Sequence, residues 1–127
     1  IKRNSKDTCF SCFKELFENL HFTHDQYDLS TFYNSYIDLM NFWNSSLKNY
    51  IHTVNYEDLV DSTKSNVIQM LKFCELDFEE NCLNFKENKS AVRTISISQV
   101  RNPIYKSSVG SYKYYEGNLK ILFDSLK

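Results

Sequence analysis

The scarcity of glycine and proline limits what this chain can fold into more than any other feature of its sequence. Only two Gly and one Pro occur in 127 residues, and these residue types supply most of the tight turns that connect strands. The chain is therefore expected to be mostly helical, with a few long loops. Its 42% hydrophobic and 24% charged composition is typical of a globular protein, and its length suits one domain.

Apolar side chains recur at helical spacing along most of the chain. A first helix is predicted over residues 6–20, and a longer second helix over residues 30–48 carries an aromatic stripe. At such regular spacing we interpret the stripe as core packing rather than as a ligand-binding surface. Further helices are predicted over residues 64–75 and 112–126, with a short one over residues 78–85.

Two short segments favour β-strands instead. Ile1-Lys2-Arg3 looks like the end of a strand, and residues 50–56 are rich in β-branched side chains. Two strands do not form a stable sheet by themselves, so the helices are expected to pack on strands from elsewhere. Residues 1–127 are thus predicted to be a portion of a larger domain.

Charge is distributed unevenly, although the net charge is only −1. So small a total provides no global field that would attract nucleic acid or an acidic membrane. Residues 86–113 carry many cations against Glu87 alone, which points to a small anionic ligand; a solvated charged loop is the alternative. The cations are Lys86, Lys89, Arg93, Arg101, Lys106 and Lys113. No run of about 20 apolar residues is present, so no membrane span is predicted.

Four cysteines leave three interpretations open. Cys9 and Cys12 form a C-x-x-C motif, which suits a redox pair, half of a zinc site, or two small buried thiols in a helix. A zinc site would need a second pair at similar spacing, and Cys74 and Cys82 are too far apart in the sequence to supply it. We therefore favour buried thiols, expect no metal, and interpret reduced cysteines as a sign of a cytoplasmic protein.

Three segments carry side chains suited to phosphate or nucleotide binding. In the first, Arg3–Ser11, a cation and several hydroxyl groups surround the start of a helix, where free N–H groups and the helix dipole favour anions. The second is Tyr56-Glu57-Asp58-Leu59, an aromatic residue followed by acids. The third is Ser96–Lys106, which is again rich in hydroxyl and cationic side chains.

The order and spacing of these segments resemble those of the sulfotransferase superfamily. Together with the Tyr36–Trp43 segment, they look most like bacterial sulfotransferases that often follow tetratricopeptide repeats and are related to tyrosylprotein sulfotransferase. The resemblance implies the C-terminal, mostly helical part of a P-loop-like, parallel-sheet α/β fold. It also implies transfer of a sulfuryl group from 3′-phosphoadenosine-5′-phosphosulfate to a hydroxyl or amine acceptor.

The same resemblance implies roles for particular residues. Arg3 and Ser11 would hold the 3′-phosphate of the donor, through a fork of guanidinium donors and a hydroxyl. Tyr56 would lie against the adenine, although a core aromatic residue at a strand end fits the sequence equally well. Ser96 would lie near the sulfuryl group as the catalytic residue. Further anion contacts are implied for Arg101, Lys106, Ser107 and Lys113.

The resemblance further implies that the Gly-rich loop for the 5′-phosphosulfate and the general base precede Ile1. The chain is then expected to be inactive alone, with the nucleotide and an acceptor as partners and tetratricopeptide repeats upstream. His21, His24 and His52 are interpreted as surface or linker residues. Two other classes stay open: a non-catalytic helical module whose basic loop binds a protein or polyanion, and a P-loop kinase relative that does not need the 3′-phosphate.

Overall fold

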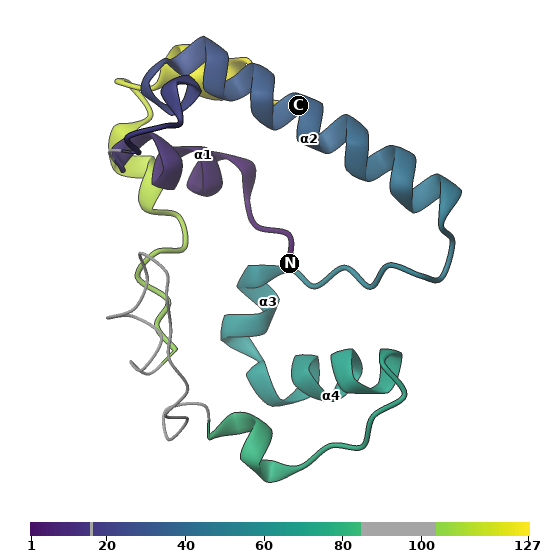
Figure 1. Ribbon diagram of the computed structural model, residues 1–127. Coiled ribbons are helices and arrows are strands. Elements are labelled where there is room, and N and C mark those ends of the chain that lie inside the picture. The colour runs from purple at the N-terminus through teal and green to yellow at the C-terminus, as the bar shows by residue number, and fades with distance from the viewer. Residues whose placement is uncertain (16, 85–103) are drawn as a thin grey trace. The chain divides into compact units, whose positions relative to one another are not determined.

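The computed structural model describes residues 1–15, 17–84 and 104–127. The chain divides into two compact units, which we describe separately: unit 1 comprises Ile1–Thr53 and Ser107–Lys127, and unit 2 comprises Val54–Lys106. Figure 1 traces the chain through both units. Every regular element in the described part is helical. The prediction of a mostly helical chain is confirmed, whereas the parallel sheet stays a prediction.

Unit 1 is built from helices at both ends of the chain. The elements are α1 (Ser5–Lys14), the 3₁₀ helix η1 (His21–His24), α2 (Gln26–Ser46), the 3₁₀ helix η4 (Ser111–Tyr115) and α5 (Lys120–Asp124). Helix α2 packs against both α1 and α5, and α1 also contacts η4. Figure 1 shows the yellow C-terminal segment lying along the first part of α2.

The start of α2 is fixed by an aspartate cap. The Asp25 carboxylate accepts hydrogen bonds from the backbone N–H groups of Tyr27 at 2.8 Å and Asp28 at 2.9 Å. These bonds satisfy donors that the first turn of a helix cannot pair internally. The helix therefore begins four residues before the predicted Ser30, at Gln26.

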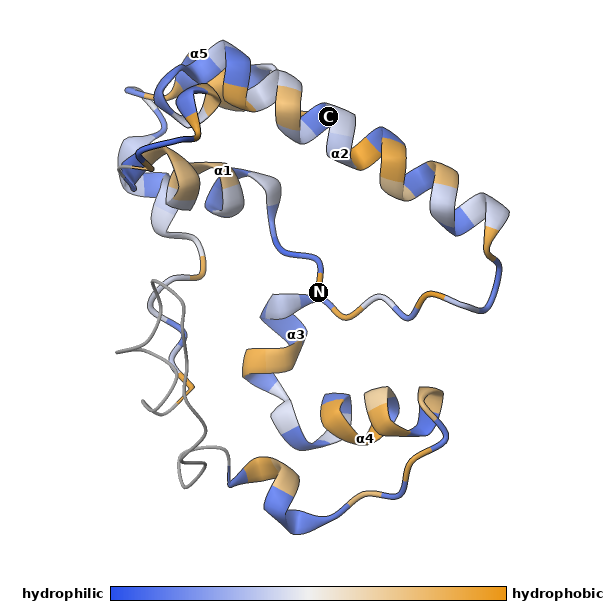
Figure 2. Ribbon diagram, viewed as in Figure 1, coloured by the Kyte–Doolittle hydropathy of each residue, from blue (hydrophilic) through white to orange (hydrophobic). Residues whose placement is uncertain are grey.

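The buried core of unit 1 joins the two ends of the chain. Its members come from α1, α2 and the segment leading through α5. Figure 2 shows hydrophobic and hydrophilic positions alternating along α2. The buried apolar residues are Cys9, Leu29, Tyr33, Leu119, Leu122 and Phe123. Tyr112 meets Phe123 edge to face, with ring centroids 5.7 Å apart. The core thus depends on residues that are about 90 positions apart in the sequence.

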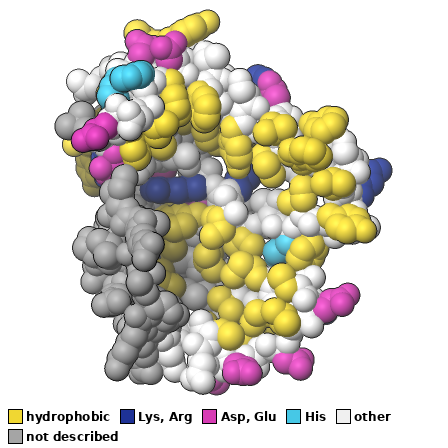
Figure 3. Space-filling model, viewed as in Figure 1, with side chains coloured by type: hydrophobic (Ala, Val, Ile, Leu, Met, Phe, Trp, Pro, Cys, Tyr) yellow, Lys and Arg dark blue, Asp and Glu magenta, His cyan; other side chains and the backbone are white. Residues whose placement is uncertain are grey.

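The aromatic stripe of α2 is only partly core. Leu29 and Tyr33 are buried, as predicted, but Leu39 and Trp43 on the later turns are 52% and 40% exposed. Figure 3 shows hydrophobic side chains gathered at the surface along this helix. The C-terminal segment pairs with the earlier part of α2, where the Asn34 side-chain amide donates to the carbonyl of Ser125 at 2.8 Å. Phe32, near the start of the stripe, is also exposed, so the core interpretation holds for Leu29 and Tyr33 and was wrong for much of the stripe.

The predicted helix over residues 112–126 is divided into two pieces. Turn residues 116–119, which include Gly117, separate η4 from α5. Glycine disfavours a continuous helix because it loses the most backbone entropy on folding. The Gln26 side chain supports the second piece, since its Oε1 accepts from the Leu122 N–H at 3.2 Å. Similarly, α1 ends at Lys14 instead of residue 20, because Glu15 is extended.

Unit 2 contains α3 (Tyr56–Asp61), α4 (Thr63–Phe73) and the 3₁₀ helix η2 (Glu80–Leu83). Helices α3 and α4 contact each other, and the Asn66 side chain donates to the Asp58 carbonyl at 3.0 Å. The prediction of a strand over residues 50–56 is wrong. Residues 51–54 have no regular structure, Asn55 takes part only in an isolated bridge, and Tyr56 opens a helix. A single bridge lacks the continuous hydrogen-bond ladder that stabilises a strand.

Candidate functional site

Arg3 lies directly before α1 in a half-buried position. One terminal nitrogen of its guanidinium donates a hydrogen bond to the carbonyl oxygen of Ser108, 2.7 Å away. This contact joins the start of the chain to a segment more than 100 residues later. The guanidinium is a planar fork with five N–H donors.

Arg3 and Ser11 line the same cavity of unit 1, which has a volume of about 490 Å³. Thr8 adds a second hydroxyl to its wall, and most of the other lining residues are apolar. The lining consists of Ile1, Arg3, Thr8, Cys9, Ser11, Cys12, Phe17, Leu20, Phe22, Thr23, Leu29, Phe32, Tyr33 and Tyr36. A cavity of this size that is mostly apolar, with a few convergent polar groups, has the usual character of a small-molecule site.

The side chain of Asp7 ties α1 to the C-terminal segment. Its carboxylate is 1% exposed and accepts three hydrogen bonds: from the Gly110 N–H at 2.6 Å, the Tyr112 N–H at 3.2 Å and the Ser111 hydroxyl at 3.3 Å. We call this arrangement of Asp7 with residues 110–112 the Asp7 clasp. Such a buried carboxylate is tolerated because donors surround it.

Gly110 makes the tight turn of the clasp possible. Its φ of 75° lies in the left-handed region that side chains disfavour. The side chain of Lys113 folds back over it, with Cε 3.5 Å and Nζ 3.8 Å from the point where a Cβ would lie. The clasp thereby sets the position of a lysine that the sequence predicted as an anion contact.

The other predicted site residues do not line the cavity that Arg3 and Ser11 share, or lie outside the described residues. Ser107 is exposed and begins the C-terminal segment of unit 1. Tyr56 and Lys106 belong to unit 2, where Tyr56 is half-buried at the start of α3 and Lys106 forms an ion pair with Asp61. This ion pair lowers the pKa of the Asp61 carboxyl, chiefly through the hydrogen bond from Lys106. The remaining two, Ser96 and Arg101, lie outside the described residues.

Asp7 is the residue of this region that the sequence did not identify as important. An aspartate in the first turn of a helix is ordinarily explained by the helix dipole, and Asp7 needs no further explanation at that level. Its partners Gly110, Ser111 and Tyr112 are more than 100 residues away. No local pattern connects residues so distant, so only the folded chain reveals the clasp.

The C-x-x-C cysteines are thiols within α1, as predicted. Cys9 is buried and Cys12 half-buried, and neither forms a disulfide. Burial raises the pKa of Cys9 to about 12, with a smaller contribution from neighbouring Cys12. The pKa of Cys12 is also raised by burial, while Arg3 opposes that increase. Thiols held in this neutral form are poor nucleophiles.

We expect Cys9 to resist alkylation in the folded protein. Between an ordinary thiol pKa and about 12, the thiolate fraction at pH 8 falls by roughly a thousandfold. Iodoacetamide labelling followed by peptide mass spectrometry should therefore modify the exposed Cys74 and Cys82 long before Cys9. Labelling of Cys9 at the rate of Cys74 under native conditions would contradict this prediction, and denaturant should equalise the rates.

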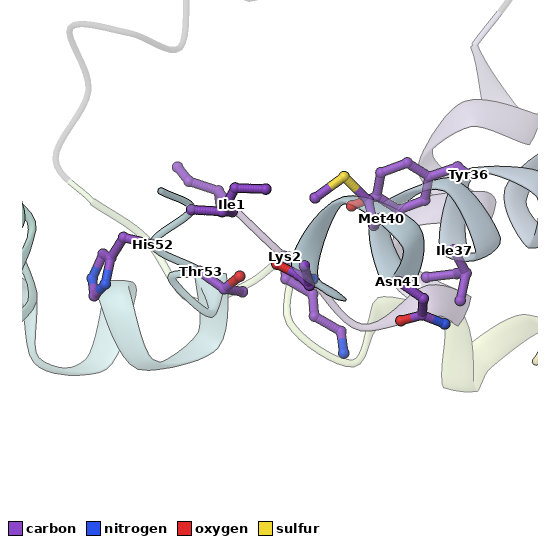
Figure 4. A pocket seen from close by; sticks show the side chains of 10 residues that line it. Ile1, Lys2, Tyr36, Ile37, Met40, Asn41, His52 and Thr53 are labelled. Atoms are coloured by element: carbon purple, nitrogen blue, oxygen red, sulfur yellow. The ribbon is translucent and has the colours of Figure 1, made fainter. Parts of the chain in front are cut away.

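A second, smaller cavity of about 240 Å³ lies between the first residues, α2 and the segment 51–53. Figure 4 shows the side chains around it, among them Lys2, Asn41 and the exposed His52. None of the residues predicted for the nucleotide lines this cavity. Its lining is mixed in polarity, and Arg3 and Ser11 line the larger cavity instead.

Two further properties hold for the described part of the chain. No three His, Cys, Asp or Glu side chains there come together as metal ligands. None of the helices in the described ranges is both long and apolar enough to cross a bilayer.

The sequence of this chain is similar to that of a known protein family and to one bacterial protein. The model of a group described as "Sulfotransferase family" matches residues 1–80, a range that includes Arg3, Ser11 and Tyr56. The chain is also 30% identical, over 131 aligned residues, to an uncharacterized protein of Aquifex aeolicus (strain VF5). That alignment covers 100% of the chain but only 17% of the relative's length. No solved structure matches the chain.

Proposed function

The chain belongs to the sulfotransferase family, and from this premise we propose that it forms the 3′-phosphate side of a site for 3′-phosphoadenosine-5′-phosphosulfate. The full-length protein would transfer the sulfuryl group of this donor to a hydroxyl or amine acceptor. Within the chain, Arg3 and Ser11 would hold the 3′-phosphate. Tyr56 would lie against the adenine, and Ser96 near the sulfuryl group.

The observation that carries this proposal is that Arg3 and Ser11 line one cavity. A phosphate dianion needs several hydrogen-bond donors, and a guanidinium fork with nearby hydroxyl groups supplies them. Thr8 and Ser11 provide two hydroxyl groups on the same wall. That the two residues assigned to the 3′-phosphate by the resemblance share one cavity supports a common ligand.

The apolar remainder of the cavity supports the same assignment. Its aromatic and aliphatic lining, which includes Phe17, Phe22 and Leu29, makes the surroundings of the polar groups less polar than bulk water. In such surroundings an ion pair is stronger than it is in bulk water. Sulfuryl transfer resembles phosphoryl transfer, in which positioning and charge stabilisation supply most of the catalysis. Fixing the 3′-phosphate would contribute to the positioning.

The finer assignments are part of the same proposal. Arg101, Lys106, Ser107 and Lys113 would add anion contacts, and all four lie beyond the residues that the family model matches. We further propose a cytoplasmic protein of the tetratricopeptide-associated type related to tyrosylprotein sulfotransferase. The 5′-phosphosulfate loop and the general base would come from a preceding part of the domain, so the chain alone would be inactive.

Nucleotide selectivity tests the proposed function. In the full-length protein we expect calorimetry to give at least about tenfold tighter binding of 3′-phosphoadenosine-5′-phosphate than of 5′-AMP, since only the first offers the 3′-phosphate to Arg3. The preference should persist at raised salt, because a bidentate contact in an apolar cavity is weakly screened. Equal affinities would contradict the proposal, as would binding governed by salt concentration alone.

A further inference from the structure

We propose that Asp7 is a positioning residue, which shapes the 3′-phosphate side of the site by fixing residues 107–113 beside Arg3. The inference rests on the proposed function, because it assigns Asp7 a role within that same nucleotide site. Asp7 would not touch the nucleotide, since a carboxylate repels a phosphate at contact distance. It would act through the segment that it holds.

Both carboxylate oxygens of Asp7 are engaged by this segment. Oδ2 accepts from the Gly110 N–H at 2.6 Å, and Oδ1 accepts from the Tyr112 N–H at 3.2 Å and the Ser111 hydroxyl at 3.3 Å. Hydrogen bonds to an ionised group are roughly twice as strong as neutral ones. Because the carboxylate is 1% exposed, water cannot replace these donors. The first turn of α1 and the turn at Gly110 are thus fixed to each other.

The turn that the clasp holds is connected to two cationic side chains, Arg3 and Lys113. Ser108, two residues before Gly110, accepts the 2.7 Å hydrogen bond from Arg3. Lys113, three residues after Gly110, places its ammonium over the Gly110 backbone, and its own N–H donates to the Gly110 carbonyl at 3.2 Å. Movement of the Gly110 turn would therefore displace Lys113 and also remove a partner that orients Arg3.

A second set of contacts, which does not involve Asp7, also joins α1 to the C-terminal segment. Lys6 lies over the rings of Tyr112 and Phe123, with Nζ 5.3 and 5.4 Å from their centroids, and it pairs with Glu116 at 3.5 Å. Loss of the Asp7 bonds should therefore loosen the turn while the unit stays folded. This separation makes a positioning role distinguishable from a purely structural one.

The test is the variant Asp7→Asn in the full-length protein. The amide has the same shape, but its NH₂ group faces a backbone N–H or a hydroxyl and cannot accept the hydrogen bond. We expect the preference for 3′-phosphoadenosine-5′-phosphate over 5′-AMP to fall about tenfold. Gly110→Ala, which strains the positive φ of the turn, should lower it less and serves as the second variant if Asp7→Asn does not fold.

Two controls separate the possible outcomes. Asp25→Asn makes the same charge change at a carboxylate that also binds two backbone N–H groups but does not line the cavity, and it should keep the wild-type preference. A wild-type protein without preference overturns the proposed function itself. A wild-type preference that both clasp variants retain overturns only the role of Asp7, as would an equal fall in Asp25→Asn.

Discussion

Replacement of Arg3 by alanine in the full-length protein should weaken the binding of 3′-phosphoadenosine-5′-phosphate by about a hundredfold. Truncating one partner of a desolvated, hydrogen-bonded charge pair typically has an effect of this size. Binding of 5′-AMP should change by less than about threefold, because it lacks the group that Arg3 contacts. Titration calorimetry with the two nucleotides measures both affinities.

Two companion variants sharpen this result. Arg3→Lys keeps the charge but loses the bidentate fork, so it should fall between wild type and Arg3→Ala. Lys2→Ala removes the neighbouring cation, which is exposed and does not line the larger cavity, and it should leave both affinities unchanged. Equal weakening of the two nucleotides by Arg3→Ala would refute the 3′-phosphate assignment.

Replacement of Leu122 by alanine should produce the largest loss of stability in unit 1. The side chain is 0% exposed and belongs to the core that joins α2 to the end of the chain. Truncation of a buried leucine to alanine removes apolar contacts and leaves a cavity, at a cost of about 3 kcal/mol in the free energy of unfolding. Urea denaturation should show this loss, with a melting temperature lower by about 10 °C.

The adjacent residue offers a matched control. Ile121 is on the same helix but 61% exposed, so Ile121→Ala should change the free energy of unfolding by less than about 0.5 kcal/mol. Similar losses for the two variants would contradict the placement of α5 in the core. The Leu122→Ala protein should also retain its nucleotide preference where it is folded, since Leu122 contributes neither to the clasp nor to the cavity.

The helical content, and the placement of Arg3 and Ser11 around the start of α1, follow from local sequence. Apolar spacing predicts a helix in each region where α1, α2, α4 and η2 occur, because the 3.6-residue period is a property of the chain itself. Arg3 and Ser11 are eight residues apart across a helix start, and the structure places both on one cavity. The C-x-x-C thiols also lie in α1, as their context in the sequence predicts.

Boundaries and exposure depended on contacts that the local pattern does not contain. The Asp25 cap lengthened α2, and the turn at Gly117 divided the last helix. The aromatic stripe of α2 has one period throughout, but Leu29 and Tyr33 are buried whereas Phe32 and Trp43 are exposed. Periodicity identifies an apolar face, whereas burial requires a second element to lie against it.

By itself, then, the sequence determined the helical character of this protein and the family to which it belongs. It also supplied residue types that suit an anion site. These properties depend only on local spacing and on the chemistry of the side chains. Only the tertiary structure decided that Asp7 holds the Gly110 turn, and that Arg3 donates to Ser108. Those partners are more than 100 residues apart, and a hydrogen bond between them exists only after the core brings both ends of the chain together.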